Sequence, residues 1–111
     1  AVLDINPAVD GHILVIPKKH AVLMNQLDES TVAHLGMVAK QLSQAAIRAF
    51  KAEGTSVFVQ NGPAAGQTVF HFHVHIVPRY DNVPLRRHTG DMENSTVLQE
   101  QAQRIRAVLA S

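Results

Sequence analysis

The stretch that decides the fold is His71-Phe72-His73-Val74-His75-Ile76-Val77, in which a histidine stands at every second position. Apolar side chains fill the gaps, and their β-branched or aromatic character favours a strand. Since alternate residues of a strand point to opposite faces, we expect the three imidazoles to form a row with spacings of about 6.6 Å. The alternation predicts a strand over residues 69–77, with Phe70 and the other apolar residues facing a core and Pro78 ending the strand.

The row of imidazoles indicates a functional site rather than a purely structural role. Neighbouring imidazoles repel when they are protonated, and side chains that titrate near neutral pH suit proton transfer or metal binding. Two histidines separated by one strand residue, with a further histidine elsewhere, also have the spacing of a zinc site. The residues alone therefore leave a catalytic site and a zinc site as alternatives, although the motif contains no carboxylate or cysteine.

Length and composition predict one globular domain covering residues 1–111, with 46% hydrophobic residues and a formal net charge of +1. This charge gives no indication of a nucleic-acid or membrane partner. The chain has no cysteine, which excludes disulfides and thiolate metal sites and fits a reducing compartment. No apolar run approaches the length of about 18 residues that a membrane span needs, so we expect a cytoplasmic protein.

Three more short strands and two helices are predicted around the histidine strand. Residues 1–4 and 12–16 are apolar runs on either side of a turn rich in Asn, Pro, Asp and Gly, which predicts a hairpin. A third strand is expected over residues 56–60, followed by a Gly/Ala loop over residues 61–67. The sequence therefore predicts an α+β domain with four antiparallel strands.

Both helices carry recognisable end signals. The first is expected over residues 29–52, with Asp28 as its N-cap and Gly54 as its stop. The second begins near Thr96, which resembles a capping box together with Gln99. Apolar residues recur at helical spacing along both segments, so each helix is expected to bury one face.

Three further blocks of sequence accompany the histidine row: Leu3-Asp4-Ile5-Asn6-Pro7, Gly11-His12-Ile13-Leu14-Val15-Ile16-Pro17-Lys18-Lys19-His20 and residues 61–70, Asn-Gly-Pro-Ala-Ala-Gly-Gln-Thr-Val-Phe. Together with the histidine row they resemble the histidine-triad (HIT) nucleotide-binding and hydrolase family. The resemblance implies a HIT-like antiparallel meander sheet with two helices and a homodimer in which two sheets join edge to edge. Family members usually have a helix and a strand before this point, and we expect the chain to lack them.

The resemblance also implies a role for each motif. His73 would attack the α-phosphorus of a purine nucleotide conjugate and form a nucleotidyl-histidine intermediate, and His75 would stabilise charge or pass a proton to the leaving group. His71 and His12 would orient the other rings. Nucleotide contacts would come from Asp4 (ribose), Ile5 (base) and the phosphate-side residues Asn61, Gly66, Gln67 and Thr68. Lys18, Lys19 and His20 are expected at the surface without a role.

The activity closest to these motifs is that of the purine-nucleoside phosphoramidase (Hint-like) branch, on AMP or GMP phosphoramidates and with no cofactor required. The loop before the triad also resembles dinucleoside polyphosphate hydrolases of the same family. Two alternatives from other classes are a zinc protein and a nucleotide-binding module without physiological turnover. Without the resemblance, Asp4 would be a strand-end turn residue, Ile5 a core residue and residues 61–68 an ordinary hairpin turn.

Overall fold

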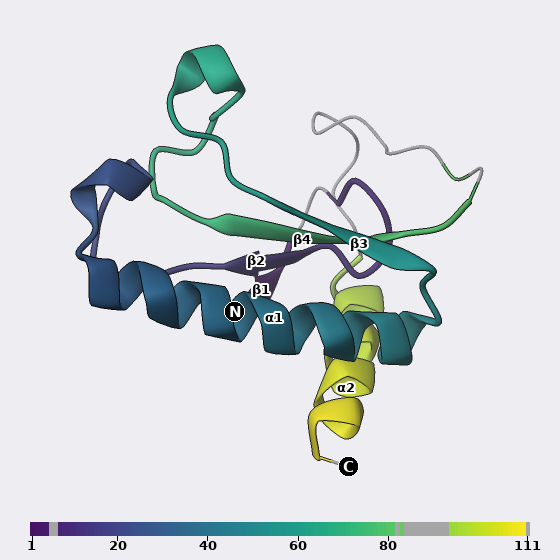
Figure 1. Cartoon of the computed structure of the whole chain (residues 1–111). Helices are drawn as coiled ribbons and strands as arrows, with labels where there is room; N and C mark the ends of the chain where they lie inside the picture. Colours follow the sequence, from purple (N-terminus) through teal and green to yellow (C-terminus); the bar gives the residue numbers. More distant parts are fainter. Residues whose placement is uncertain (5–6, 82, 84–93, 111) are drawn as a thin grey trace.

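The computed structural model describes residues 1–4, 7–81, 83 and 94–110, which form one sheet with two helices (Figure 1). The strands are β1 (Val2–Leu3), β2 (Ile13–Val15), β3 (Gly54–Phe58) and β4 (Val74–Arg79). The helices are α1 (Glu29–Phe50) and α2 (Ser95–Ala110), and the short 3-10 turns are η1 (Met24–Gln26) and η2 (Pro63–Ala65). The α+β class, the antiparallel sheet and the two helices are therefore confirmed.

The strand order is β1-β2-β4-β3, and every neighbouring pair is antiparallel. This order differs from a simple meander in one respect, because β3 pairs with β4 and not with β2. Helix α1 connects β2 to β3 and runs along one face of the sheet (Figure 1). As a result β4 is flanked on both sides, and its residues 74–78 are all buried.

The core lies between α1 and the sheet. Alanine and leucine side chains on one stripe of α1 pack against the inward residues of β2 and β4, with Ala46 and Ile76 completely buried. Small alanines let the helix approach the sheet closely, and the apolar area removed from water stabilises the fold. None of the helices in the described part of the chain is long and apolar enough to cross a membrane.

The ends of the helices differ in detail from the predicted ones. Asp28 does stand at the N-cap of α1, and hydrogen bonds from Thr31 and Ser30 lower the pKa of its carboxyl group. The helix stops at Lys51, which adopts the left-handed conformation (φ 52°), and the predicted stop at Gly54 is wrong because this residue begins β3. The predicted N-cap at Thr96 is also wrong: the side chain of Asn94 accepts the Thr96 N–H, so Asn94 caps α2.

The histidine strand is shorter than predicted. It begins at Val74, so only His75 of the three histidines lies within β4, and Phe70 is 56% exposed rather than in the core. The physical reason is that β4 has neighbours only from this point: Val15, the last residue of β2, pairs with Val74. Alternation describes a local preference, but a strand also needs a partner for its backbone groups.

Pro78 does not end the strand either. It lies inside β4 opposite Thr55 of β3. The pairing between β2 and β4 stops at Ile76, so at Pro78 the strand β4 pairs with β3 alone. A residue without an N–H is tolerated at such a position, because one side of the strand needs no donor. The third strand likewise spans residues 54–58 instead of 56–60, because it follows β4 to its end.

Candidate active site

Four of the predicted site residues, Asp4, His12, His73 and His75, gather beside β4. Asp4 follows β1 and His12 precedes β2, and the Asp4 N–H donates to the His12 carbonyl (2.9 Å), which closes the β1–β2 turn. The side chain of His12 reaches across to that of His75 on β4. The ring of His73 lies against the ring of His75, with centroids 4.7 Å apart.

His73 is held in one tautomer. Its Nδ1 lies 2.7 Å from the carbonyl oxygen of His71. A carbonyl can only accept a hydrogen bond, so Nδ1 must carry the proton, and the neutral ring then bears its lone pair on Nε2. The half-buried His73 therefore presents Nε2 as a nucleophile, with its orientation fixed by the backbone next to it.

His12 and His75 form a buried pair, each only 1% exposed. The backbone N–H of Ala8 donates to Nδ1 of His12 (3.1 Å), so the proton of neutral His12 is on Nε2. That Nε2 lies 2.9 Å from Nδ1 of His75 and donates to it. His75 then carries its own proton on Nε2, and the aromatic ring of Phe58 stacks on it with centroids 4.6 Å apart.

The buried carboxylate of Asp4 stands behind this pair. Its Oδ2 lies 3.6 Å from Nδ1 of His12. The contact is not an ordinary salt bridge, because the same nitrogen already accepts the N–H of Ala8. Asp4 therefore places a buried negative charge beside the outer end of the His12–His75 pair.

His71 is the outer member of the triad and sits in the irregular segment before β4. Its Nε2 lies 3.3 Å from the carbonyl oxygen of Pro17, and its Nδ1 lies 3.3 Å from Nδ1 of His20. The prediction that His20 has no role at the surface missed this contact. Nothing in the spacing along the sequence links residues 20 and 71, since only the folded chain brings them together.

The loop before the triad is folded back on itself. Gln67 is buried, its side-chain oxygen accepts the Gly62 N–H (2.8 Å), and its amide nitrogen donates to the carbonyl of Val22 (2.8 Å). The side chain of Asn61 accepts the N–H of Met24 (2.9 Å). These two side chains therefore tie the loop to residues 22–24.

The other predicted contact residues of this region lie at the surface. Thr68 is exposed, and Gly66 ends η2 with a positive φ of 95°. The N–H groups of Gly66 and Gln67 donate to carbonyls within the loop, at 3.0 and 3.1 Å. A phosphate could take these donors only if the turn opened. Ile5, the predicted base contact, lies outside the described residues.

One group of three potential metal ligands occurs in the described part of the chain, formed by Asp4, His12 and His75. The donor set of one carboxylate and two imidazoles is chemically suitable for zinc. In this arrangement, however, both ring nitrogens of His12 already take part in hydrogen bonds. Zinc could bind His12 only if one of those bonds broke, so the geometry fits a hydrogen-bonded chain better than a metal centre.

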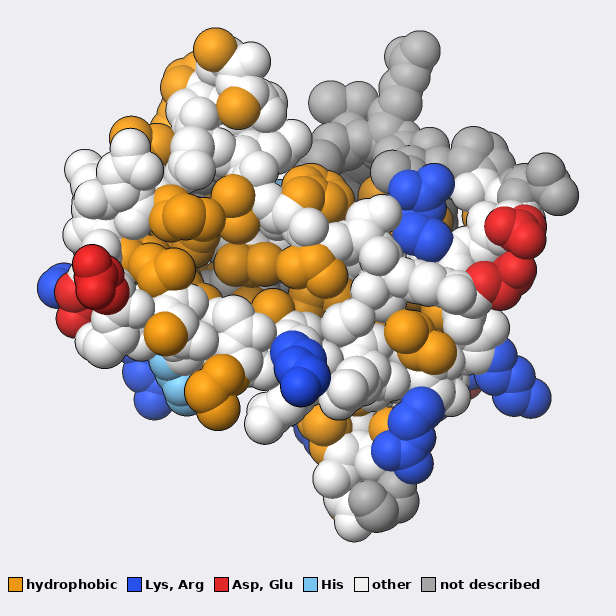
Figure 2. Space-filling model, in the orientation of Figure 1, with side chains coloured by type: hydrophobic (Ala, Val, Ile, Leu, Met, Phe, Trp, Pro, Cys, Tyr) orange, Lys and Arg blue, Asp and Glu red, His pale blue; other side chains and the backbone are white. Residues whose placement is uncertain are grey.

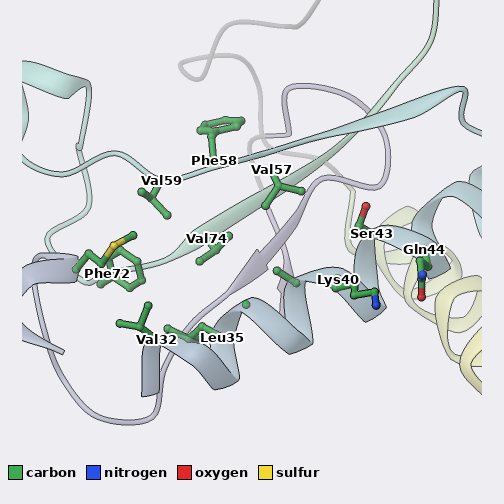
Figure 3. A pocket seen from close by; sticks show the side chains of 13 residues that line it. Val32, Leu35, Lys40, Ser43, Gln44, Val57, Phe58, Val59, Phe72 and Val74 are labelled. Carbon is green, nitrogen blue, oxygen red and sulfur yellow. The ribbon is translucent and has the colours of Figure 1, made fainter. Parts of the chain in front are cut away.

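A separate apolar cavity of about 530 Å³ lies between α1 and β3, away from the polar edge of the histidines. Figure 2 shows hydrophobic side chains gathered in this hollow, and Figure 3 shows Val32 and Leu35 of α1 facing Val57, Val59 and Val74 across it. Lys40, Ser43 and Gln44 are the polar lining residues. The Ser43 hydroxyl is hydrogen-bonded to that of Thr55 (2.6 Å), and no histidine or carboxylate lines the cavity, so we do not assign it to the chemistry.

Comparison with known proteins links this arrangement to one family. Residues 1–82 match the HIT domain. An uncharacterized HIT-like protein of Mycoplasma genitalium is 44% identical over 81 residues, covering 73% of this chain and 57% of that protein. The adenylylsulfatase HINT3 of Arabidopsis thaliana is 37% identical over 94 residues, covering 79% of this chain and 48% of HINT3. The chain thus spans about half the length of these curated relatives.

Solved structures agree in fold. A Hit-like protein of Bartonella henselae superposes with a TM-score of 0.87 at 35% identity, covering 96% of this chain and 76% of that one. A zinc-bound histidine triad protein of Mycobacterium smegmatis superposes with a TM-score of 0.81 at 36% identity, covering 97% of this chain and 75% of that one. The diadenosine triphosphate hydrolase of Plasmodium falciparum superposes with a TM-score of 0.80 at 25% identity, covering 98% of this chain and 69% of that one.

Proposed function

Because the chain belongs to the HIT domain family, we propose that it is a nucleotidyl hydrolase or transferase that uses His73 as its nucleophile. The observation that carries this proposal is the hydrogen bond between Nδ1 of His73 and the His71 carbonyl, at 2.7 Å. This bond leaves the lone pair of His73 on Nε2, and a neutral imidazole nitrogen is a competent nucleophile toward phosphorus.

In the proposed reaction, Nε2 of His73 forms a bond to the α-phosphorus of a purine nucleotide conjugate as the bond to the leaving group breaks. The leaving group departs with the electron pair and takes a proton from Nε2 of His75. A water molecule then attacks the same phosphorus and gives a proton back to Nε2 of His75, while the phosphorus–nitrogen bond breaks and its electron pair returns to His73. The His12–His75 pair, with Asp4 behind it, thus passes a proton from the water to the leaving group over the two steps and stabilises the charge that develops.

The predicted nucleotide contacts complete this proposal. Asp4 and Ile5 bind the ribose and the base, and Asn61, Gly66, Gln67 and Thr68 lie on the phosphate side. The turn must open for the N–H groups of Gly66 and Gln67 to bind the phosphate, because both donate within the loop. Since the side chains of Asn61 and Gln67 are already hydrogen-bonded to the backbone, their contribution includes holding the loop in shape. Thr68 is exposed and can donate its hydroxyl directly.

We propose phosphoramidates of AMP or GMP as the substrate class, in line with the Hint-like motifs of the sequence. Dinucleoside polyphosphates are the second candidate, favoured by the structural similarity to a diadenosine triphosphate hydrolase. Rates on an AMP phosphoramidate, a GMP phosphoramidate, a diadenosine polyphosphate and adenylyl sulfate, measured side by side, test the choice. A phosphoramidate preference supports the first candidate, and a higher rate on the diadenosine compound replaces it with the second.

The test of the proposed enzyme class is turnover of this panel by the wild type and by His73→Ala. We expect the variant to lose at least about a thousandfold in rate, because it lacks the nucleophile. His34→Ala, at an exposed position on α1, is the matched control and should keep full activity. Full activity in a folded His73→Ala protein would reject the proposal.

A zinc role and a non-catalytic binding role remain the alternatives to this function. The zinc-bound relative from Mycobacterium smegmatis favours the first. We propose that no cofactor is required, because the hydrogen bonds of His12 compete with metal coordination. Metal analysis of protein purified without a histidine tag tests this, and stoichiometric zinc retained through dialysis against a chelator would contradict it.

We also propose a homodimer that joins at β3, the edge strand beside the apolar cavity. Val57 of β3 is 48% exposed and lines this cavity. A second copy would cover this apolar surface and the edge of β3, which pairs with no second strand among the described residues. Light scattering on the wild type and on Val57→Glu tests the proposal. A dimer that the substitution dissociates supports it, and a monomeric wild type at micromolar concentration contradicts it.

A further inference from the structure

The outer triad histidine is held at both of its ring nitrogens. Nε2 of His71 lies 3.3 Å from the carbonyl oxygen of Pro17, and Nδ1 lies 3.3 Å from Nδ1 of His20. The rings of His20 and His71 meet edge to face, with centroids 5.0 Å apart and planes at 78°. Histidine 20 is exposed, whereas His71 is half-buried, so the pair connects the surface to the inner part of the site.

The direction of these hydrogen bonds follows from the chemistry of the partners. The Pro17 carbonyl can only accept, so the proton of neutral His71 is on Nε2 and its Nδ1 is an acceptor. The Nδ1 of His20 must then be the donor, whether His20 is neutral or protonated. His20 therefore selects the same tautomer of His71 that the Pro17 carbonyl selects.

The consequence reaches the nucleophile through the backbone of His71. The carbonyl oxygen of His71 accepts the Nδ1 proton of His73 at 2.7 Å, and this bond sets the position of the reactive Nε2. Residues 71–73 precede β4, so the sheet ladder does not hold them. The peptide that carries the His71 carbonyl is held at its other side by the bond from the Phe72 N–H to the carbonyl of Ala21, the residue after His20 (2.7 Å). The ring of His71, anchored between His20 and Pro17, is thus a means of fixing the peptide that orients His73.

We propose that His20 is a positioning residue for nucleotidyl transfer, acting through His71 on the orientation of His73. This inference rests on the proposed function, because it concerns the rate of attack by His73. Reacting atoms must be placed to within about 1 Å, and a misplacement of that size can cost about a hundredfold in rate. One lost hydrogen bond two steps from the nucleophile should therefore reduce the rate of adduct formation by about tenfold.

The test compares His20→Leu with His20→Asn, whose side-chain amide N–H can occupy the place of the imidazole Nδ1–H. His34→Leu, on the exposed face of α1, is the control for loss of a surface histidine. The rate constant of nucleotidyl adduct formation and the KM are measured on an AMP phosphoramidate, with a chelator present so that no metal contributes. Thermal unfolding of each variant verifies that it is folded, and His20→Ala replaces His20→Leu if the latter is not.

We expect His20→Leu to form the adduct about tenfold more slowly with KM changed by less than about twofold, because His20 does not touch the nucleotide in this proposal. His20→Asn should recover most of the rate. Nitrogen-15 spectra of the imidazoles give an independent readout: His71 should be protonated at Nε2 in the wild type and should become a mixture of tautomers in His20→Leu. A purely structural role of His20 would leave these tautomers unchanged.

The outcomes separate the two proposals. A wild type that forms an adduct, together with a His20→Leu protein of equal rate, rejects the role of His20 and leaves the proposed function intact. Equal loss in His20→Leu and His20→Asn also rejects it, because the donor would then not matter. A wild type that forms neither adduct nor product rejects the proposed function and this inference with it.

Discussion

Gly11 is the position where one added methyl group should disturb the site most directly. It stands immediately before His12 and has a φ of +84°, a conformation that costs an L-residue about 1–2 kcal/mol. A Cβ at this position would lie 2.7–3.0 Å from three atoms of the Phe50 ring. The ring, on the last residue of α1, is buried and cannot retreat far, so overpacking should add about 1–3 kcal/mol.

Gly11→Ala should therefore lower the free energy of unfolding by about 2–5 kcal/mol, a large part of the 5–15 kcal/mol typical of such domains. Gly36→Ala is the matched control, because a Cβ at this helical position would meet nothing within 4 Å. There the change should stabilise the protein by about 0.5–1 kcal/mol, since Gly is a poor helix former.

Urea unfolding followed by circular dichroism measures both variants against the wild type, with the two-state slope compared to detect changes in the unfolded state. The turn that carries His12 should also shift, so Gly11→Ala should be less active at temperatures where it is still folded. A Gly11→Ala protein within about 0.5 kcal/mol of the wild type would refute the reasoning, because the strain and the contact would then both be absent.

Two further predictions concern buried hydrogen bonds. Tyr80→Phe removes the bond from the phenol to the Phe50 carbonyl (2.7 Å) and should cost about 1 kcal/mol, as urea unfolding would show; an unchanged midpoint would contradict it. Burial raises the pKa of the Tyr80 phenol in the folded protein above its value of about 10 in the unfolded chain. The stability that the neutral phenol contributes is therefore complete below about pH 10 and is lost as the pH rises through the folded-state pKa. Stability should accordingly fall more steeply above about pH 10 in the wild type than in Tyr80→Phe. Gln67→Met leaves the half-buried N–H of Gly62 and carbonyl of Val22 without this partner, which should cost about 1 kcal/mol and slow turnover. A variant with wild-type stability and rate would indicate that these bonds are not needed to hold the loop.

The elements that sequence reasoning located well are those fixed by local patterns. Helix α1 was expected over residues 29–52 and spans Glu29–Phe50, because its apolar stripe and Asp28 cap are local signals. The β1–β2 hairpin was likewise predictable from its turn residues. In each case the information lies within a few residues of the feature that it specifies.

The wrong predictions concern strand boundaries that depend on parts of the chain far away in the sequence. The alternation at residues 69–77 is compatible with a strand, yet Phe72 donates its N–H to the Ala21 carbonyl (2.7 Å) rather than to a neighbouring strand. The lengths of β2 and β3 determine where β4 can begin to pair, and those lengths cannot be inferred from the sequence of β4. Pro78 and Phe70 were misassigned for the same reason.

In the candidate site, too, some features follow from local sequence patterns and others only from the folded chain. The pattern of histidines indicated a functional site, and the resemblance to the family supplied the roles of His73 as nucleophile candidate and of His12 as its partner. The tautomer of His73 depends on the direction of the His71 carbonyl, and the contact between His20 and His71 depends on the path of the chain. Neither could be inferred from residue types, because both are properties of the folded backbone.

The most direct test of the account is the intact mass of the protein, quenched without acid shortly after mixing with an AMP phosphoramidate. We predict a mass increase of one nucleotidyl group in the wild type, located by proteolysis on the peptide that contains His73, and no increase in His73→Ala. An adduct on another residue, or product formation by His73→Ala at the wild-type rate, would contradict the claim that His73 is the nucleophile.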